Sequence, residues 1–302
     1  MRSLLAPSIL LALLTLSACS AVKSSSSSST TTGTGGAGGS GGDITAGTTS
    51  GEGGSFTSAA GGAGGGQGGG EPQIAEVYGH SPTTLYRLDP DTKAVTEVGA
   101  FDGCGQVIDI ALDKDSHLYG TTFDGLYTID KTTAKCALIA SGGYPNSLSF
   151  VPAGTVDPDK EALVGYLGST YVRIDPQTGT VTTIGGISGG YSSSGDVVSV
   201  KGGKTYLTVN GFDCSDCIVE VDPKTGDLVK NWGTVGHSGV YGLAFWAGKA
   251  YGFDDFGQIF EIDFAMDGSG VSTVNIPIPG NPTLQFWGAG STTSAPPVPV
   301  PK

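Results

Sequence analysis

Five aspartates recur along the chain and are the first residues whose type and spacing suggest chemistry. They are Asp89, Asp130, Asp175, Asp222 and Asp263. Repeated carboxylates are typical of cation sites. In the copy Asp175-Pro-Gln-Thr-Gly179, however, the Asp-Pro pair fits the start of a type I turn, whose amides donate to the aspartate side chain. Gly179 fits the left-handed position, which Lys93 and Ala134 occupy in the first two copies. We therefore expect these aspartates to cap turns, and we predict no metal site.

The five cysteines offer redox chemistry, metal binding or cross-links. Cys214-Ser-Asp-Cys217 has a spacing that occurs in local disulfides, redox pairs and half zinc sites. A redox pair normally begins a helix, which this stretch does not predict, and the sequence has no second pair to complete a zinc site. We therefore predict a Cys214–Cys217 disulfide. By elimination Cys104 pairs with Cys136, although no strand pattern brings the two together.

Two histidines and two inner-strand aspartates carry the case for catalysis. His80 and His237 belong to different repeat units and would serve as base and acid in a lyase. Asp109 and Asp196 are the carboxylates expected near the axis of the fold, where a metal-dependent lactonase needs several convergent ligands. The sequence shows no Ser-His-Asp order and no Gly-x-Ser-x-Gly motif. We assign no catalytic residue, and a lactonase- or lyase-type enzyme is the alternative function.

Short alternating strands must position these residues. From Gln73 to about Gly290, alternating runs are separated by Gly, Pro, Asn and Asp clusters, and no helical period is evident. The strand-ending aspartates lie 41, 45, 47 and 41 residues apart, which is the length of a propeller blade. Each full unit contains four runs, so the pattern predicts an all-β fold of four-stranded antiparallel blades.

The two ends of this region predict that the array closes on itself. The N-terminal unit begins at its second strand, near Ile74, and lacks a first strand. The C-terminal end carries a lone first strand, Thr283-Leu-Gln-Phe-Trp-Gly288. An open array would need a cap at each end, whereas a ring closes by adding this strand to blade one. We predict a five-bladed β-propeller over residues 73–290.

In its alternating hairpins and Asp-Pro-x-Thr-Gly turns, the region 74–290 resembles propellers of the quinoprotein-like and YVTN superfamily. The resemblance implies a ring of antiparallel blades. Quinoprotein dehydrogenases have more blades and a repeated tryptophan motif, whereas this chain has only Trp232, Trp246 and Trp287, unevenly spaced. The resemblance therefore does not extend to a quinone, and we expect no cofactor.

One face of such a propeller gathers the candidate binding residues. It is formed by the connections between the second and third strands of each blade and by those between blades. The candidates are His80, Phe123, Asp124, Tyr144, Asn146, Tyr191, Asn210, Phe212, His237, Tyr241, Asp254 and Phe256. Aromatic side chains mixed with carboxylates and amides are typical of a sugar- or cation-binding rim. The alternative is that long loops collect such residues without a binding role.

The N-terminus resembles a bacterial lipoprotein signal. Arg2 precedes an apolar segment that is too short to span a bilayer, and Leu16-Ser-Ala-Cys19 resembles the lipobox that precedes an acylated cysteine. The resemblance implies cleavage after residue 18, lipidation of Cys19 and anchoring in a membrane. Because Ser20 replaces the aspartate that retains lipoproteins in the inner membrane, it also implies an outer-membrane destination.

The remaining segments and the net charge limit the classes of partner that we expect. Residues 20–72 are nearly all Ser, Thr, Gly and Ala, and residues 291–302 are rich in proline, so we expect a disordered linker and a disordered tail. The net charge of −13 argues against nucleic acid as a partner. We therefore expect a monomeric, membrane-tethered module that binds a protein or a carbohydrate.

Overall fold

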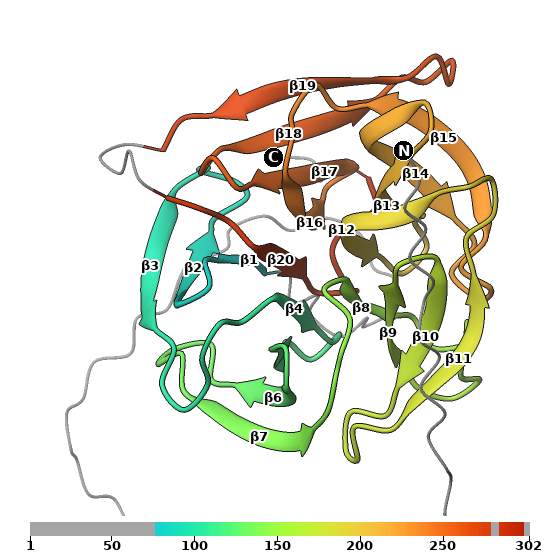
Figure 1. The fold of residues 1–302 in the computed structure, drawn as a ribbon. Helices are drawn as coiled ribbons and strands as arrows, with labels where there is room; N and C mark the ends of the chain where they lie inside the picture. Colours follow the sequence, from blue (N-terminus) through green and yellow to red (C-terminus); the bar gives the residue numbers. More distant parts are fainter. Residues whose placement is uncertain (1–75, 279–283, 299–302) are drawn as a thin grey trace, which may run out of the picture. The chain divides into compact units, whose positions relative to one another are not determined.

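The computed structural model describes residues 76–278 and 284–298, which belong to one compact unit spanning residues 66–302. The described residues form twenty β-strands and no α-helix. Five antiparallel four-stranded sheets are arranged in a ring, as Figure 1 shows. The predicted all-β, five-bladed propeller is therefore confirmed.

The blades follow one another along the chain, and each is ordered from the axis outward. Blade one contains β20 (Gly288–Ser291), β1 (Val77–His80), β2 (Thr84–Leu88) and β3 (Val95–Ala100). Blade two contains β4 (Asp109–Leu112), β5 (Leu118–Thr121), β6 (Gly125–Ile129) and β7 (Cys136–Ser141). Blade three contains β8 (Leu148–Val151), β9 (Ala162–Leu167), β10 (Thr170–Ile174) and β11 (Val181–Gly186). Blade four contains β12 (Ser192–Ser199), β13 (Thr205–Gly211), β14 (Cys214–Val221) and β15 (Leu228–Thr234). Blade five contains β16 (Val240–Trp246), β17 (Lys249–Asp254), β18 (Ile259–Phe264) and β19 (Val271–Ile276).

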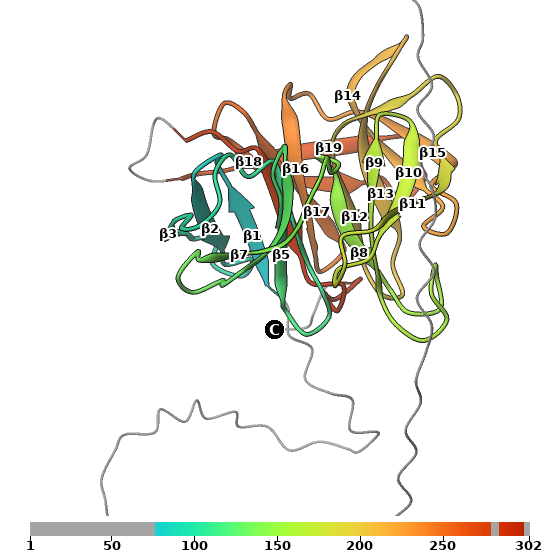
Figure 2. The same ribbon diagram turned by 60° about the horizontal axis from the view of Figure 1, so that its bottom comes forward.

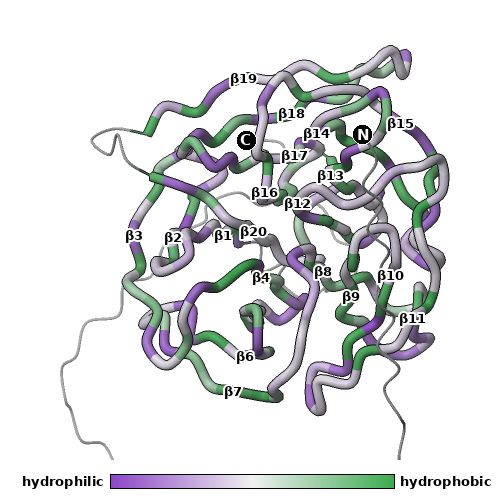
Figure 3. Tube along the Cα trace, in the orientation of Figure 1, coloured by the Kyte–Doolittle hydropathy of each residue, from purple (hydrophilic) through white to green (hydrophobic). Residues whose placement is uncertain are grey.

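The hydrophobic core lies between neighbouring blades. Five buried clusters are present, and each joins the facing sides of two adjacent blades. Tyr166 and Tyr171 of blade three, for example, pack with Leu207 of blade four. Figure 3 shows apolar stretches along β9 and β10, whose residues alternate between the two sides of the sheet. Burial between blades therefore stabilises the ring rather than any single sheet.

Strand β20 closes the ring by pairing with β1, with Val77 opposite Ser291 and His80 opposite Gly288. The predicted closure is confirmed, but the closing strand begins five residues later and ends three residues later than the predicted 283–288 run. The alternating apolar residues that predicted a strand instead pack into the core. Leu284 and Phe286 are buried in the cluster between blades five and one. Thr283 lies outside the described residues.

Part of the expected tail packs on the propeller. Thr292 is fully buried, pairs with Leu112 of blade two, and donates its amide to the Glu76 carbonyl at 3.2 Å. The Thr293 carbonyl accepts the Lys201 amide at 2.7 Å. The structure therefore differs from the predicted disordered tail up to residue 298, because backbone groups just after β20 hydrogen-bond to three other segments.

The turn role of the repeated aspartates is confirmed in four copies. The Oδ1 atom of Asp175 accepts the amides of Gln177 at 2.8 Å and Thr178 at 3.0 Å. Asp89, Asp130 and Asp222 accept the corresponding amides. The left-handed position is kept without glycine, with a φ of 63° at Lys93 and 56° at Ala134. These carboxylates therefore define turns, as the sequence predicts.

Both predicted disulfides are present, Cys104–Cys136 and Cys214–Cys217. The first depends on the path of the connection between blades one and two. That connection runs beside the start of β7, where the Asp102 amide donates to the Ala134 carbonyl and the Cys136 amide donates to the Asp102 carbonyl. The Cα atoms of Cys104 and Cys136 are thereby held 5.6 Å apart.

The predicted lipoprotein signal, Cys19 and the 20–72 linker lie outside the described residues. Within the described ranges, the chain forms no helix with the length and apolar character needed to cross a membrane.

Candidate functional site

The connections between strands gather at two opposite ends of the blades, as the turned view in Figure 2 shows. We call one end the loop face: the connections between the second and third strands of each blade and those between blades. We call the other end the turn face: the remaining connections, including the aspartate turns. All twelve candidate binding residues belong to the loop-face connections or to the strand ends that adjoin them.

A cavity of about 420 Å³ opens on the loop face over the centre of the ring. We call it the mouth pocket. Its lining residues are Ile108, Phe123, Tyr144, Pro145, Asn146, Leu167, Gly168, Tyr241 and Trp287. Four of them, Ile108, Asn146, Tyr241 and Trp287, lie at the entrances of four different innermost strands, which places the pocket over the axis. Four aromatic side chains thus converge on one cavity.

Two of these aromatic side chains are exposed and one is held in place. Phe123 is 65% exposed and Tyr241 is 36% exposed. Tyr144 is buried, and its hydroxyl donates to the Gly179 carbonyl at 3.0 Å. Phe123 also lines a neighbouring hollow with Gln106 and Asp124. The mouth pocket therefore has one fixed wall, and Phe123 forms a ridge between two hollows.

Two buried carboxyl groups lie on the innermost strands just inside the ring. Asp109 begins β4, Asp196 lies on β12, and their side chains hydrogen-bond to each other. Asp109 accepts the amides of Ile110 at 2.8 Å and Leu148 at 2.6 Å. Burial raises the pKa of Asp109, the neighbouring carboxylate raises it further, and burial also raises the pKa of Asp196. The pair therefore holds its protons more tightly than two separate carboxyl groups in water would.

His80 lies beside this pair and not at the surface. Its side chain is fully buried, and burial lowers its pKa to about 4. The Nδ1–H group donates to the Ser81 carbonyl at 2.9 Å, which leaves Nε2 as an acceptor with no partner among the described residues. A Cβ on Gly288 would collide with both His80 Nε2 and Asp109 Oδ1. His80 therefore belongs to the interior of the ring.

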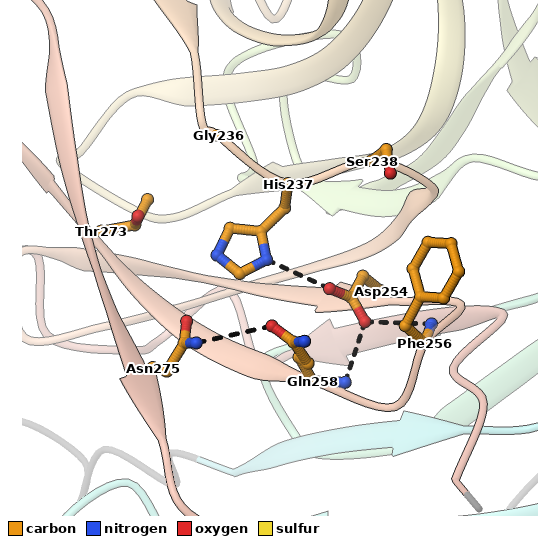
Figure 4. Close-up of a pocket in the computed structure, with 8 residues that line it drawn as sticks. All are labelled: Gly236, His237, Ser238, Asp254, Phe256, Gln258, Thr273 and Asn275. Atoms are coloured by element: carbon orange, nitrogen blue, oxygen red, sulfur yellow. Dashed lines mark hydrogen bonds and ion pairs between the residues drawn. The ribbon is translucent and has the colours of Figure 1, made fainter.

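A second pocket, of about 650 Å³, lies on blade five, and we call it the blade-five pocket (Figure 4). Its lining residues are Gly236, His237, Ser238, Asp254, Phe256, Gln258, Thr273 and Asn275. The His237 ring stacks on Phe260 with centroids 3.7 Å apart, and its Nδ1 lies 3.1 Å from Asp254 Oδ2. Asp254 is buried and also accepts two backbone amides.

The acid and base proposed for a lyase are not brought together. The ring of His80 faces Gly288 and Asp109, while that of His237 lies between Phe260 and the blade-five pocket. Within the described ranges no contact joins the two rings. The structure therefore gives the two histidines separate surroundings.

A third group of candidates lies on blade four. The Tyr191 hydroxyl donates to Asp213 at 3.3 Å and accepts from Asn231 at 3.0 Å. Asn210 accepts the Asp216 amide at 3.0 Å, and Phe212 is fully exposed. These residues shape the loop but line neither of the two pockets described above.

Sequence reasoning missed several lining residues. The sequence pattern places Trp287 in the closing strand, and Thr273 and Asn275, which lie on β19, are not among the predicted site residues. Their polarity follows ordinary strand alternation and gives no signal of a pocket. The one group of described side chains spaced like metal ligands, Asp113, Asp115 and His117, lies on the turn face, where Asp113 caps the Asp115 and His117 amides.

No protein-family model and no curated protein matches this chain. Among solved structures, hydrazine synthase of Kuenenia stuttgartiensis is similar, with 13% identity and a TM-score of 0.37 over 68% of this chain. This chain spans 62% of the length of that chain. A Bacteroides caccae protein of unknown function is similar at 16% identity, with a TM-score of 0.38 over 72% of this chain and 77% of that one. A chain of a nidogen/laminin complex is similar at 7% identity, with a TM-score of 0.43 over 74% of this chain and 100% of that one. At these values the similarities assign neither a family nor an activity to this chain.

Proposed function

We propose that this propeller is a binding module that holds a carbohydrate in the blade-five pocket, on a chain tethered to the outer membrane through Cys19. The observation that carries the proposal is an array of neutral hydrogen-bonding side chains beside an exposed aromatic ring. His237, Gln258, Thr273 and Asn275 supply the array, and Phe256 supplies the ring. Sugars present hydroxyl groups and apolar ring faces, so this combination complements them.

The imidazole of His237 is oriented to accept a ligand hydroxyl. Asp254 is 2% exposed and accepts from Nδ1, so the proton of the neutral ring resides on Nδ1. The Nε2 lone pair is then the free acceptor of His237. Stacking on Phe260 holds the ring in one plane. Asp254 is therefore a positioning residue that acts through His237.

The amide pair extends the array. The Asn275 Nδ2 atom donates to Gln258 Oε1 at 3.4 Å, as Figure 4 shows. The other ends of the two amides, Asn275 Oδ1 and Gln258 Nε2, have no other hydrogen-bond partner in the described part of the chain. They offer one acceptor and one donor, which is the pairing that a sugar hydroxyl needs.

Phe256 supports the apolar side of a sugar ring. Its side chain is 69% exposed at the edge of the pocket. An aromatic ring that is exposed beside polar groups loses unfavourable contact with water when a sugar covers it. The pocket volume is also within the range of small-ligand sites.

Binding to a glycan array, followed by calorimetric titration with the best glycan, tests the proposal. The protein used is the full chain with Cys19→Ala, a substitution that removes the site of acylation and leaves the propeller unchanged. Asn275→Ala and Phe256→Ala are each expected to weaken binding about tenfold, the loss expected when one hydrogen bond or one ring contact is removed. Val274→Thr is the matched control, because Val274 is exposed and lies between the two pocket residues of β19.

The tether has a test of its own. Incorporation of labelled palmitate into the wild-type chain, and its loss in Cys19→Ala, is the result that lipidation requires. Recovery of the wild-type protein in the soluble fraction without label contradicts the tether and leaves the carbohydrate proposal standing.

The enzyme alternative predicts a different outcome in the same titration. A lactonase or lyase would convert its ligand, whereas a binding module returns it unchanged. Mass analysis of the bound glycan after prolonged incubation separates the two functions. Cleavage that depends on His237 would overturn the non-catalytic assignment.

A further inference from the structure

The two faces of the propeller differ completely in their cationic side chains. Every Lys and Arg in the described ranges lies in a turn-face connection or in the part of a strand that adjoins one: Arg87, Lys93, Lys114, Lys131, Lys135, Lys160, Arg173, Lys201, Lys204, Lys224, Lys230 and Lys249. The ion pairs of these residues are likewise with turn-face carboxylates, such as Lys93 with Glu261 at 2.6 Å and Arg173 with Asp157 at 2.7 Å. The loop face of the described structure therefore contains no Lys or Arg.

Carboxylates remain on the loop face without a Lys or Arg to neutralise them, although Asp254 contacts the His237 ring. They are Asp102, Asp124, Asp213, Asp216, Asp254 and Asp255. No ion pair with Lys or Arg reaches any of them in the described structure. A concave surface lined by one sign of charge raises the local concentration of ions of the opposite sign. The loop face therefore attracts cations.

Exposed aromatic rings occur on the same face. Phe123, Phe212, Tyr241 and Phe256 are the exposed aromatic side chains of the described residues, and all four lie there. In three blades an exposed aromatic ring directly adjoins a carboxylate in the sequence. These pairs are Phe123-Asp124, Phe212-Asp213 and Asp255-Phe256. Aromatic faces and carboxylates both attract cations, by the ring quadrupole and by charge.

The mouth pocket concentrates this chemistry at the centre of the face. Phe123, Tyr144, Tyr241 and Trp287 line its roughly 420 Å³. Asp255 stands beside Tyr241, because a Cβ on Gly239 would lie 3.3 Å from Asp255 Cβ and 3.9 Å from the Tyr241 ring. The Oδ1 atom of Asp255 is buried and has no hydrogen-bond partner in the described structure. An unpaired acceptor thus lies next to the aromatic wall.

We propose that the mouth pocket binds an organic cation of the trimethylammonium class. The pocket lining contains no carboxylate, so a primary ammonium group would enter without a charged acceptor for its N–H groups. A quaternary ammonium group has no N–H, and its methyl groups suit walls formed by aromatic rings and by Leu167. The loop-face carboxylates, including Asp255, act on it from outside the lining. This proposal does not depend on the carbohydrate proposal for blade five.

Calorimetric titration of the full chain with Cys19→Ala tests it with three probes that share a hydroxyethyl group and differ at its other end. Choline carries the quaternary charge, 3,3-dimethylbutan-1-ol has the same shape without charge, and ethanolamine carries a primary ammonium group. Choline is expected to bind, and each of the other two is expected to bind about tenfold more weakly or not at all. Equal affinity for choline and the neutral alcohol, or no choline binding, overturns the proposal.

Variants test whether choline binds in the mouth pocket. Tyr241→Leu removes a ring and is expected to weaken choline binding about tenfold, while Tyr241→Phe keeps the ring and the affinity. Val274→Thr, at an exposed position of β19 away from the mouth pocket, is the control and leaves choline binding unchanged. If Tyr241→Leu and wild type bind choline equally, the assignment to the mouth pocket is wrong. Loss of choline binding in Tyr241→Phe as well contradicts the role of the ring.

The same head group occurs on a free solute and on a lipid. Co-sedimentation of the chain with phosphatidylcholine vesicles, but not with phosphatidylglycerol vesicles, assigns the cation to a lipid surface. Choline binding without co-sedimentation assigns it to a soluble ligand. Either result supports cation binding in the mouth pocket. Stronger co-sedimentation with phosphatidylglycerol contradicts it, because the loop face would then prefer an anionic surface.

Discussion

Asp109 of blade two and Asp196 of blade four hydrogen-bond to each other inside the ring, and both side chains are fully buried. Each also accepts an amide from the next blade: Asp109 from Leu148 of blade three, and Asp196 from Leu243 of blade five. This one pair therefore links the innermost strands of four blades beneath the mouth pocket.

The Asp109–Asp196 pair makes stability depend on pH. Burial raises both pKa values above the ordinary 3.8, so the folded protein retains a proton that the unfolded chain releases. The stabilisation is complete below pH 3.8 and is lost as pH rises through the raised pKa. We predict that the difference in unfolding free energy between wild type and Asp109→Asn decreases as pH rises from 4. Urea unfolding at a series of pH values measures this difference, and a constant difference would contradict the raised pKa values of the pair.

The left-handed turn positions predict substitutions of opposite effect. Gly179 has a φ of 70°, and a Cβ there would collide with Ala140 and the Tyr144 hydroxyl. Gly179→Ala is therefore expected to destabilise the protein by about 1–2 kcal/mol or more and to disturb the fixed wall of the mouth pocket. Ala134 holds a φ of 56° with a Cβ already, so Ala134→Gly relieves strain of about 1 kcal/mol, less the packing that its buried methyl group loses. Thermal unfolding compares the two, and equal losses would contradict the account of the turns.

The two disulfides are expected to contribute unequally. Cys104 and Cys136 are 32 residues apart, whereas Cys214 and Cys217 are three apart. Loop-closure entropy then gives about 3–4 kcal/mol for the first and about 1–2 kcal/mol for the second. Paired Cys→Ser variants in chemical unfolding test this order. A larger loss from the Cys214–Cys217 pair would show that loop closure does not dominate.

Asp254 is predicted to control carbohydrate binding without touching the ligand. Asp254→Ala leaves the amides of Phe256 and Gln258 without an acceptor and frees the His237 ring. We expect a loss of about 1–3 kcal/mol in stability and a fall in glycan affinity. Asp254→Asn restores an acceptor for the amides but does not fix the proton on Nδ1. Asp254→Asn is therefore expected to restore the stability lost in Asp254→Ala while its glycan affinity stays low. Recovery of both stability and affinity would contradict a positioning role.

The local features of the fold were predictable because they depend on neighbours in the sequence. The Asp175 turn needs only its own amides, and the Cys214–Cys217 bridge joins two residues at the start of one strand, β14. Ring closure was predictable from two complementary ends, but the position of β20 was not. Leu284 and Phe286 pack into the core between two blades, and their alternation in the sequence is the same as that of a strand.

The site was predictable as a face but not as pockets. Connection topology alone placed Phe123, Tyr144 and Tyr241 at one end of the blades. The burial of His80 depends on its approach to Gly288 from the far end of the chain, which no local pattern contains. Asn275 enters the blade-five pocket only because β18 and β19 pair in one register. Long-range packing therefore determines which candidates meet.

Glycan titration of the full chain with Cys19→Ala is the most direct test of the binding function. The account predicts that a neutral saccharide binds, is recovered unchanged, and loses about tenfold in affinity with Asn275→Ala and with Phe256→Ala, but not with Val274→Thr or Tyr241→Leu. Failure of every glycan to bind, or equal affinity in all four variants, would contradict the assignment of the blade-five pocket.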